Sequence, residues 1–552
     1  MQYNRLGPPE KAPTHVNTVY EAFSKAAENW ADRPFLHIPA VACRDYADGP
    51  IDISYAEALA RVDQCASQYR DRGFGAPLRV ALALDNRPEF FEHWLALNKL
   101  GCSVIPINRE LTAEEIAWFL DHGEAQALVS LPDALDALRE VANHTQTTVP
   151  LVDCTDLTQL PKRQQTRAEA PQADTECALL FTSGSTGKPK GCILSNDYFL
   201  FAGEWYGKLD GRCDIIAGEE RLLTPLPLTH MNAMAVSSMA MIMSGGCIIQ
   251  LDRFHPSSWW QAVRDSRATI VHYLGVLPAI LLEMPATPDD DIGNQVKFGF
   301  GAGVNPRHHE RFETRFGFPL IEAWAMTESG VGGSIIASRE PRHVGSCCFG
   351  RPDGVDVELV DEHGQRVATG EPGELRVRAS GPDPRRGFFS GYLKNEAATS
   401  EIWQDGWLNT GDLVRENTDG SLHFVDRRKN VIRRSGENIA ALEVEGALAH
   451  CPGIANVVVT AVPDELRGDE VAALVIREDK RLDETMLAEQ IVAHCLAHLA
   501  YFKAPGYILY CDDLPLTASN KPKRADIKQL ARERVATGHC IDTRALKKRQ
   551  VH

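Results

Sequence analysis

The sequence predicts an α/β protein with more than one domain, and three observations support this. Apolar strand-like runs alternate with helical segments over residues 79–129, which is the pattern of a doubly wound unit with a parallel sheet. A second such unit is expected over 225–325. From about Gly350 short alternating strands and tight turns replace this pattern, and the 552 residues are too many for one hydrophobic core.

Local sequence signals predict the elements of the first unit and a helix that precedes it. The segment 18–21 has a capping-box pattern, which begins a helix that continues toward Trp30. Residues 79–84 form an apolar run typical of a buried strand, and 88–100 have helical periodicity up to Gly101. A strand over 103–107, a helix over 112–122 that stops at Gly123, and a strand over 127–129 complete the alternation.

The run 233–249 is apolar enough to raise a membrane span. Three serines and the Gly245-Gly246 break argue against it, so we expect a buried helix, a Gly-Gly stop and a strand over 247–249. The first residues have no apolar core of a signal peptide.

The last third of the chain predicts a β-rich region and then another domain. Residues 355–360 and 373–378 alternate in polarity around a turn at 361–364, as in a hairpin. A second domain is expected to begin near Arg427, with helices over 441–450 and 483–500 and strands between them. The end of the chain, 544–552, is interpreted as a solvated basic tail.

Charge and cysteine content limit the class of partner. The net charge is −17, which disfavours non-specific binding to nucleic acid or to an anionic membrane. The 14 cysteines include no CxxC pair and mostly lie in apolar runs, which indicates buried free thiols in a reducing compartment such as the cytoplasm.

The loop 181–191, FTSGSTGKPKG, carries the strongest functional signal. Four hydroxyl side chains, three glycines and two lysines lie between two apolar runs. Glycines let backbone N–H groups approach an anion, hydroxyls donate to phosphate oxygens, and lysines neutralise charge. Pro189 follows Gly187-Lys188, so the loop lacks the Ser or Thr that binds magnesium in the P-loop of NTPases. A plain surface turn is the alternative.

This loop resembles the signature of the adenylate-forming enzymes, which include acyl-CoA synthetases, luciferases and the adenylation domains of peptide synthetases. Four further segments agree in the family's order: 324–328 (WAMTE), 410–412 (TGD), 426–437 and 514–521. The resemblance covers almost the whole chain. It implies a large N-terminal domain of residues 1–426, with two doubly wound α/β subdomains and a β-rich subdomain, and a small mobile α+β C-terminal domain of 427–552.

The resemblance implies a two-step ligase reaction that uses ATP, Mg²⁺ and coenzyme A. A carboxylate attacks the α-phosphate of ATP to give acyl-AMP and pyrophosphate, and a thiol then displaces AMP. Glu328 matches the magnesium-associated carboxylate, Thr327 a phosphate contact, and Thr186 a second residue near the metal; a helix cap is the alternative for Thr327 and Glu328. The implied ATP-binding residues are Thr182, Ser183, Gly184, Ser185, Thr186, Gly187, Lys190, Gly301, Ala302, Gly303, Trp324, Asp412 and Arg427.

The C-terminal segment supplies the remaining implied roles. Lys521 matches the catalytic lysine, although a solvated charge cluster is the alternative, and Lys429 matches the hinge. Ser435 and Gly436 match the turn that lines the pantetheine tunnel, although Gly436 could simply permit a turn. The implied acyl and CoA contacts are His230, Asn232, Gly275, Val276, Ala323, Ser435 and Gly436, with a packed core histidine as the alternative for His230.

Within the family, 95–106 and 500–505 look most like the carnitine/crotonobetaine–CoA ligase branch. The expected partner is a small-molecule carboxylic acid, with no nucleic acid and no stable membrane insertion, and homo-oligomerisation is compatible with the sequence. Two alternatives remain open: an adenylation enzyme that loads a separate carrier protein, and a non-catalytic nucleotide-binding relative.

Overall fold

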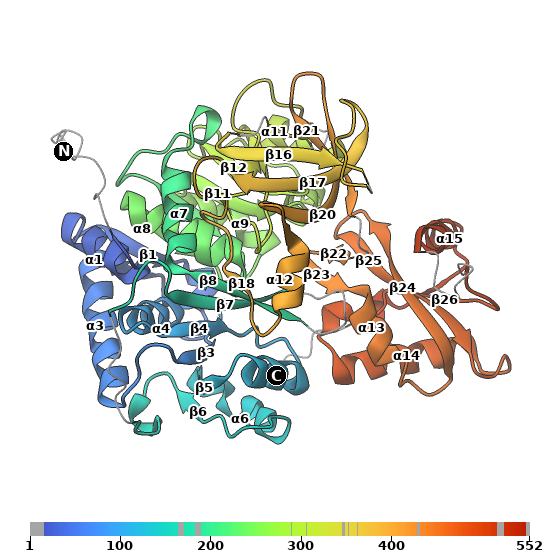
Figure 1. The fold of residues 1–552 in the computed structure, drawn as a ribbon, viewed down its shortest axis with the longest axis horizontal. Helices are drawn as coiled ribbons and strands as arrows, with labels where there is room; N and C mark the ends of the chain where they lie inside the picture. Colours follow the sequence, from blue (N-terminus) through green and yellow to red (C-terminus); the bar gives the residue numbers. More distant parts are fainter. Residues whose placement is uncertain are drawn as a thin grey trace.

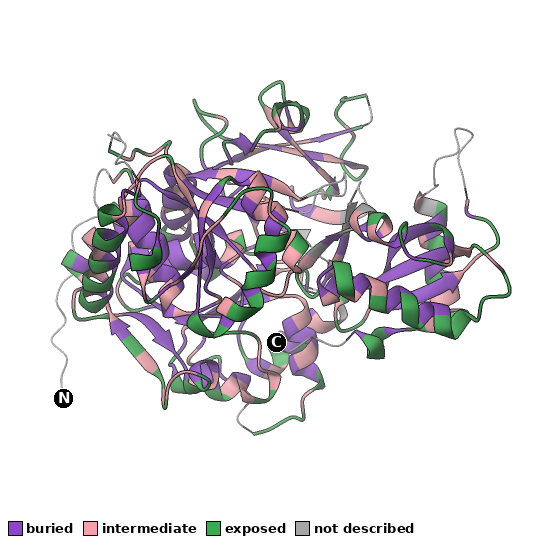
Figure 2. Ribbon diagram, turned by 90° about the horizontal axis from the view of Figure 1, so that it is seen from below, coloured by how far each residue is buried: buried purple, intermediate pink, exposed green. Residues whose placement is uncertain are grey.

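The computed structural model describes residues 16–163, 170–182, 189–288, 290–304, 306–344, 348–350, 353–361, 363–427, 431–515 and 524–547. Figure 1 shows a large body formed by the first three quarters of the chain and a smaller domain beside it, formed by the last quarter. In Figure 2 the strands are mostly purple, whereas the outer faces of the helices are green, so the cores lie on the sheets.

The first sheet of the large body has the order β18-β8-β7-β4-β3-β5-β6. Its central strands are parallel, as the alternation of strands and helices predicts, whereas β7, β8 and β18 are joined antiparallel. The strands are β3 (Arg79–Ala83), β4 (Ser103–Pro106), β5 (Ala125–Ser130), β6 (Leu151–Asp153), β7 (Glu176–Thr182), β8 (Lys190–Ser195) and β18 (Gly391–Tyr392).

The second sheet has the order β14-β13-β12-β11-β9-β10-β1-β2. The expected unit over 225–325 supplies its parallel centre, but its other edge comes from the start of the chain, because β1 pairs with β10. The strands are β1 (Pro34–Ile38), β2 (Ile51–Ser54), β9 (Arg221–Thr224), β10 (Cys247–Gln250), β11 (Ile270–Leu274), β12 (Phe298–Ala302), β13 (Leu320–Trp324) and β14 (Ile335–Ile336).

A shared helical layer lies between these two sheets. Helices α1 (Val19–Asn29), α4 (Pro88–Lys99), α7 (Asn196–Gly207) and α8 (Ser238–Ser244) contact one another there. Thr18 caps α1 as predicted. The run after residue 232 forms a π-helical turn, Asn232–Ser237, then α8, and Gly245 ends it with φ +67° before β10. The other helices of the body are α2 (Ala40–Cys43), α3 (Tyr55–Asp71), α5 (Ala113–His122), α6 (Leu135–Leu138), α9 (Trp259–Asp265), α10 (Val276–Glu283), α11 (Pro306–Phe316) and α12 (Glu396–Ile402).

The predicted β-rich region is a third, antiparallel sheet in the order β15-β21-β20-β17-β16, with β19 on β20. The hairpin expected from the alternating pattern is β16 paired with β17. The strands are β15 (Cys348–Phe349), β16 (Val355–Val360), β17 (Pro372–Ala379), β19 (Trp403–Gln404), β20 (Trp407–Glu416) and β21 (Leu422–Arg427).

The smaller domain has its own sheet, in the order β23-β22-β25-β26-β27 with β24 on β25. Alternate residues of the long strands enter two different cores, Val471 and Ala473 on one face and Ala472 and Leu474 on the other, because side chains alternate across a strand. Its elements are β22 (Val431–Arg434), β23 (Glu437–Ala440), α13 (Ala441–Leu448), β24 (Ile454–Asp464), β25 (Gly468–Arg477), α14 (Glu484–His498), β26 (Tyr507–Tyr510), α15 (Arg524–Ala536) and β27 (Ile541–Asp542).

Candidate active site

The phosphate-binding loop predicted from the sequence is closed at its base by two antiparallel strands. Thr182 at the end of β7 lies opposite Lys190 at the start of β8. The predictions for Ser183, Gly184, Ser185, Thr186 and Gly187 lie outside the described residues. The two described ends of the loop therefore lie side by side, where β7 ends and β8 begins in the first sheet.

A buried carboxylate lies next to this loop. Tyr392 of β18 donates a hydrogen bond of 2.7 Å to Glu328, and Lys190 Nζ lies 4.7 Å from the centre of the Tyr392 ring. Burial, and then the nearby Glu328 carboxylate, raise the pKa of Tyr392, so its hydroxyl remains a donor. The residues after Trp324 form turns, so the helix-cap alternative for Thr327 and Glu328 is wrong. Sequence reasoning missed Tyr392, which belongs to none of the motifs.

The residues predicted for the adenine and for the ribose meet across two sheets. Trp324, at the end of β13, donates its indole N–H to Asp412 Oδ2 at 2.8 Å. Asp412 lies opposite Arg427 in the β20–β21 pair, and both Trp324 and Asp412 are buried. Strands distant in sequence thus bring the three predicted residues to one place.

The glycine turn at the end of β12 packs directly against the end of β11. A Cβ on Gly275 would lie 1.7 Å from the carbonyl oxygen of Gly303, so only glycine allows these backbones to approach. Glu322, which sequence reasoning missed, accepts a hydrogen bond of 2.8 Å from the backbone N–H of Val304. Burial raises the pKa of Glu322 to about 6. Its carboxyl group therefore holds the turn that contains Gly301, Ala302 and Gly303.

Asn232, one of the residues predicted to contact the acyl group, adjoins the buried, neutral imidazole of His272. Asn232, in the π-helical turn, contacts His272 Nδ1 at 3.0 Å, and Ser237 contacts the same nitrogen at 2.8 Å. Tyr206 OH lies 3.0 Å from the other ring nitrogen. Burial lowers the pKa of His272 to about 3, so the ring is neutral. π-helical turns are frequent at functional sites.

The smaller domain inserts a tight turn beside these residues. Ser435 and Gly436 join β22 to β23 with φ values of +51° and +91°. A Cβ on Gly436 would lie 2.1 Å from Leu274 Cδ1, so the turn lies directly against the end of β11. His230 Nε2 lies 3.6 Å from Glu437 Oε2. Desolvation opposes the charged imidazolium, but the Glu437 carboxylate more than offsets it and raises the pKa of His230.

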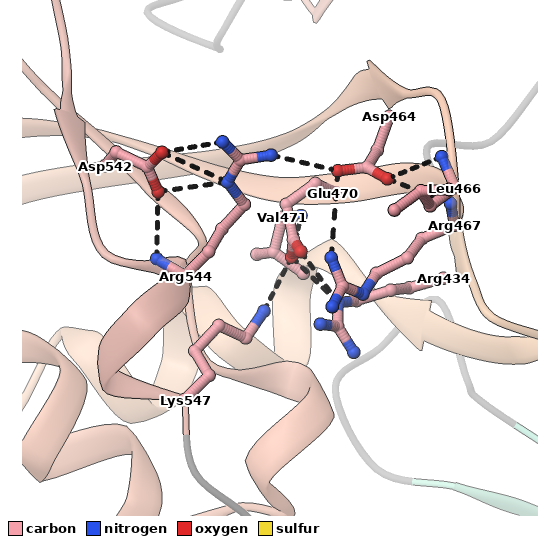
Figure 3. A network of polar contacts seen from close by, with 9 residues as sticks. All are labelled: Arg434, Asp464, Leu466, Arg467, Glu470, Val471, Asp542, Arg544 and Lys547. Carbon is pink, nitrogen blue, oxygen red and sulfur yellow. Dashed lines mark hydrogen bonds and ion pairs between the residues drawn. The ribbon is translucent and has the colours of Figure 1, made fainter. Parts of the chain in front are cut away.

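The strand that precedes this turn is anchored by buried charges (Figure 3). Arg434 Nε lies 2.9 Å from both carboxylate oxygens of Glu470, and Lys547 Nζ lies 2.6 Å from one of them. The prediction of a solvated tail is therefore wrong for Lys547, which is buried, whereas Arg544–Leu546 form a 3-10 helical turn whose residues are exposed. Residues 548–552 lie outside the described residues.

The structure thus brings the phosphate side, the ribose side and the acyl side of the predicted site around the ends of three sheets. Val276 begins α10 directly after Gly275, and Ala323 lies buried beside Trp324. The predictions for Lys429 and Lys521 fall outside the described residues. Among the described residues no group of three or more His, Cys, Asp or Glu side chains could hold a metal ion, and no helix is long and apolar enough to span a bilayer.

Comparison with known proteins decides the family. The model of the AMP-binding enzyme family matches residues 23–393, and that of the AMP-binding enzyme C-terminal domain matches 443–521. The chain belongs to the AMP-binding enzymes. This confirms the resemblance, because the two matches contain both the loop 181–191 and the segment that ends at Lys521.

Similarity to individual proteins supports the assignment to this family. The crotonobetaine/carnitine–CoA ligase of Escherichia coli (strain K12 / DH10B) is 29% identical over 515 residues, which cover 89% of this chain and 96% of that protein. The amide bond synthetase McbA of Marinactinospora thermotolerans superposes with a TM-score of 0.79 at 23% identity, covering 92% and 99% of the two chains. The o-succinylbenzoate-CoA synthetase MenE of Bacillus subtilis, bound to a product analogue, gives 0.78 at 23% identity, covering 94% and 99%. The two-domain α/β fold is therefore confirmed.

Proposed function

We propose that this AMP-binding enzyme is an ATP-dependent acyl-CoA synthetase. It activates a small-molecule carboxylic acid as acyl-AMP with release of pyrophosphate and transfers the acyl group to coenzyme A. The insertion of the Ser435–Gly436 turn beside Leu274 and His230 carries the proposal, because it places a residue without a side chain where a thin thiol-bearing arm would enter.

In the first half-reaction negative charge develops at phosphorus, so the site needs cations and donors more than a base. The loop from Thr182 to Lys190 would hold the β- and γ-phosphates, and Lys521 would bridge the carboxylate and the α-phosphate. The buried Glu328 carboxylate, held by Tyr392, suits a hard cation, which prefers oxygen ligands. Mg²⁺ bound there, with Thr186, would neutralise phosphate charge.

The nucleoside would lie between the glycine turn and the ribose-side pair. Trp324 offers an aromatic face to the adenine, and the turn of Gly301, Ala302 and Gly303 would face the base. Asp412 would accept from the ribose hydroxyls, with Arg427 donating to the same sugar. The Trp324 indole N–H already orients the Asp412 carboxylate through Oδ2.

For the second half-reaction we assign residues 1–426 and 427–552 to two domains that rotate about Lys429. Such rotation allows one cavity to serve two reactions. The orientation in this structure suits thioester formation, because Ser435 and Gly436 lie at the acyl side. His230, Asn232, Gly275, Val276 and Ala323 would form the walls around the acyl group.

The cysteines and the net charge indicate the compartment in which the enzyme works and the kind of partner it binds. Twelve cysteines in the described part of the chain are free thiols, which supports a reducing compartment, and we assign the enzyme to the cytoplasm. Its net charge of −17 disfavours binding to nucleic acid.

The experiment that tests this function is ATP–pyrophosphate exchange with a panel of acids, followed by detection of acyl-CoA. Crotonobetaine and carnitine begin the panel because a relative carries their names, and medium-chain and aromatic acids follow. We expect exchange with at least one acid and formation of its CoA thioester. Exchange without thioester, together with loading of a carrier protein, would support the first alternative, and nucleotide binding without exchange would support the second.

We predict that Lys521→Ala removes most acyl-AMP formation, by roughly a hundredfold or more, because a positioned cation at the transition state is lost. Thioester formation from supplied acyl-AMP should persist, since Lys521 would then have rotated away. Lys523→Ala, two residues on, is the matched control. Adenylation by Lys521→Ala at the parent rate would show that the assignment is wrong.

A further inference from the structure

Lys503 lies between two glutamates that come from the two domains. Its Nζ lies 2.5 Å from Glu115 Oε1 and 2.7 Å from Glu443 Oε1. Glu115 is in the first turn of α5 in the large domain. In the small domain, Glu443 is in the first turn of α13 and Lys503 ends a 3-10 turn (Tyr501–Lys503). The three side chains are only 8–10% exposed. This is a buried ionic contact across the domain boundary.

The charges in this cluster allow the ion pair between Lys503 and Glu115 to break when the two domains separate. Burial alone would lower the pKa of Lys503, but the two carboxylates raise it to about 12. Burial raises the pKa of Glu443; Lys503 opposes this effect, whereas Glu115 adds to it. If Glu115 moves away, Lys503 and Glu443 remain a balanced pair within one domain. Separation of the domains therefore leaves no buried charge uncompensated.

Glu115 is held rigidly for this role. Its Oε2 accepts a hydrogen bond of 2.9 Å from the backbone N–H of Thr112 and so completes a capping box, while Oε1 takes Lys503. Two neighbours reinforce the same face: Thr112 Oγ1 donates to the carbonyl of His498 at 3.4 Å, and Leu111 packs against hydrophobic clusters of both domains.

The contact is continuous with the turn that enters the site. Strand β23 begins at Glu437, which faces His230, and runs directly into α13, which carries Glu443 in its first turn. One short segment thus connects the Lys503 cluster to Gly436, which lies against Leu274. When the Lys503 cluster fixes the Glu443 end of this segment, the position of the Gly436 end is restricted as well.

We propose that Glu115 and Lys503 are positioning residues for the thioester-forming half-reaction. Their ion pair holds the small domain in the orientation in which Gly436 and Glu437 lie at Leu274 and His230. Neither residue touches the reacting atoms. The inference rests on the proposed function, because it requires two half-reactions that use different orientations of the domains.

The first test is Glu115→Gln, which keeps a residue that can complete the capping box but removes its charge. We expect thioester formation from acyl-AMP and coenzyme A to slow roughly tenfold, as for loss of one charge-assisted contact, while ATP–pyrophosphate exchange is unchanged. Glu114→Gln, at the exposed neighbouring position, is the matched control and should leave both half-reactions unchanged.

The second test exchanges the charges. Glu115→Lys places two ammonium groups together and should impair thioester formation more than Glu115→Gln. Adding Lys503→Glu restores one ammonium with two carboxylates, and we expect it to recover most of the lost rate. Melting temperatures show whether each variant remains folded, and recovery in the double variant distinguishes lost pairing from general damage.

Hydrogen exchange of the full-length protein supplies a readout independent of activity. In Glu115→Gln, faster exchange is expected at both the start of α5 and the Ser435–Glu437 turn, since the two would separate together. Equal loss of both half-reactions, or unchanged exchange at the turn, would overturn the inference. Failure of the parent enzyme to form any acyl-CoA would instead refute the proposed function.

Discussion

Gly436 combines two constraints that can be separated by experiment. Its φ of +91° disfavours any side chain, and a Cβ there would meet Leu274. We predict that Gly436→Ala keeps pyrophosphate release in the first half-reaction, because the residues proposed to bind ATP lie elsewhere. It should lose CoA-dependent turnover by roughly tenfold or more, since the collision with Leu274 occurs only in this orientation of the domains. Both half-reactions measured in parallel check this.

Gly468→Ala is the control for backbone strain alone. Gly468 has φ +81° in the adjacent strand β25, and a Cβ there would meet only the Arg433 carbonyl, at 3.3 Å. If Gly436→Ala and Gly468→Ala lower the melting temperature and both half-reactions alike, Gly436 serves only as a turn residue.

At the residue scale, motifs predicted the side chains proposed to carry the chemistry but not the side chains that hold them in place. Trp324 and Asp412 could both be predicted as nucleotide contacts because each belongs to a recognisable segment, and the structure places them in contact with each other. Tyr392, Glu322 and Lys503 could not be predicted, because each acts through a contact between elements distant in sequence. A single sequence carries no signal for such contacts.

At the scale of elements, local rules predicted the helices and strands well. Thr112 caps the start of α5 and Gly245 caps the end of α8, as capping and positive-φ preferences require. Two features escaped these rules. The pairing of β1 with β10 depends on the global topology, and the tail at Lys547 is buried because its partner, Glu470, lies 77 residues away.

The buried tail leads to a prediction about stability. Burial, and then Arg434, lower the pKa of Lys547 to about 8, although it contacts Glu470. Because its charge is disfavoured and Glu470 retains Arg434, Lys547→Met should leave the free energy of unfolding at pH 7 unchanged or raised by about 1 kcal/mol. Glu470→Gln should cost about 3–5 kcal/mol, since two buried cations lose their carboxylate. Urea denaturation measures both.

The same group predicts a pH dependence. Between pH 8 and its ordinary pKa of 10.5, Lys547 binds a proton less readily in the folded chain than in the unfolded chain. The contribution of this group to stability therefore rises with pH across that window. Lys547→Met should lack this rise. If the parent protein and Lys547→Met show the same slope above pH 8, the charge on Lys547 is not disfavoured as described.

For the whole molecule, buried neutral histidines set the response to acid. Burial lowers the pKa of His93 to about 4 and that of His272 to about 3. Below pH 6.5 the unfolded chain binds more protons at these sites, so the stability they contribute is present above pH 6.5 and is lost as pH falls toward 4. Each histidine should lower the free energy of unfolding by about 2 kcal/mol as the pH falls from 6.5 to 5.

Melting temperatures of His93→Gln between pH 7.5 and 5 check this. The variant should be less stable at pH 7.5, because the contact of 2.8 Å between Tyr69 OH and the ring is altered, yet it should lose less stability on acidification. His450→Gln, at an exposed position, should keep the slope of the parent protein. An unchanged slope in His93→Gln would contradict the assignment.

The hydrogen bond from Trp324 to Asp412 joins a fluorophore to the carboxylate proposed to bind ribose. The emission of an indole depends on the polarity and charge around its N–H group. Nucleotide that engages Asp412 would alter that charge and stack on the same ring, so the protein would carry an intrinsic optical reporter of its own occupancy. A titration would need no label, and the order in which the substrates arrive could be followed in real time by stopped-flow spectroscopy.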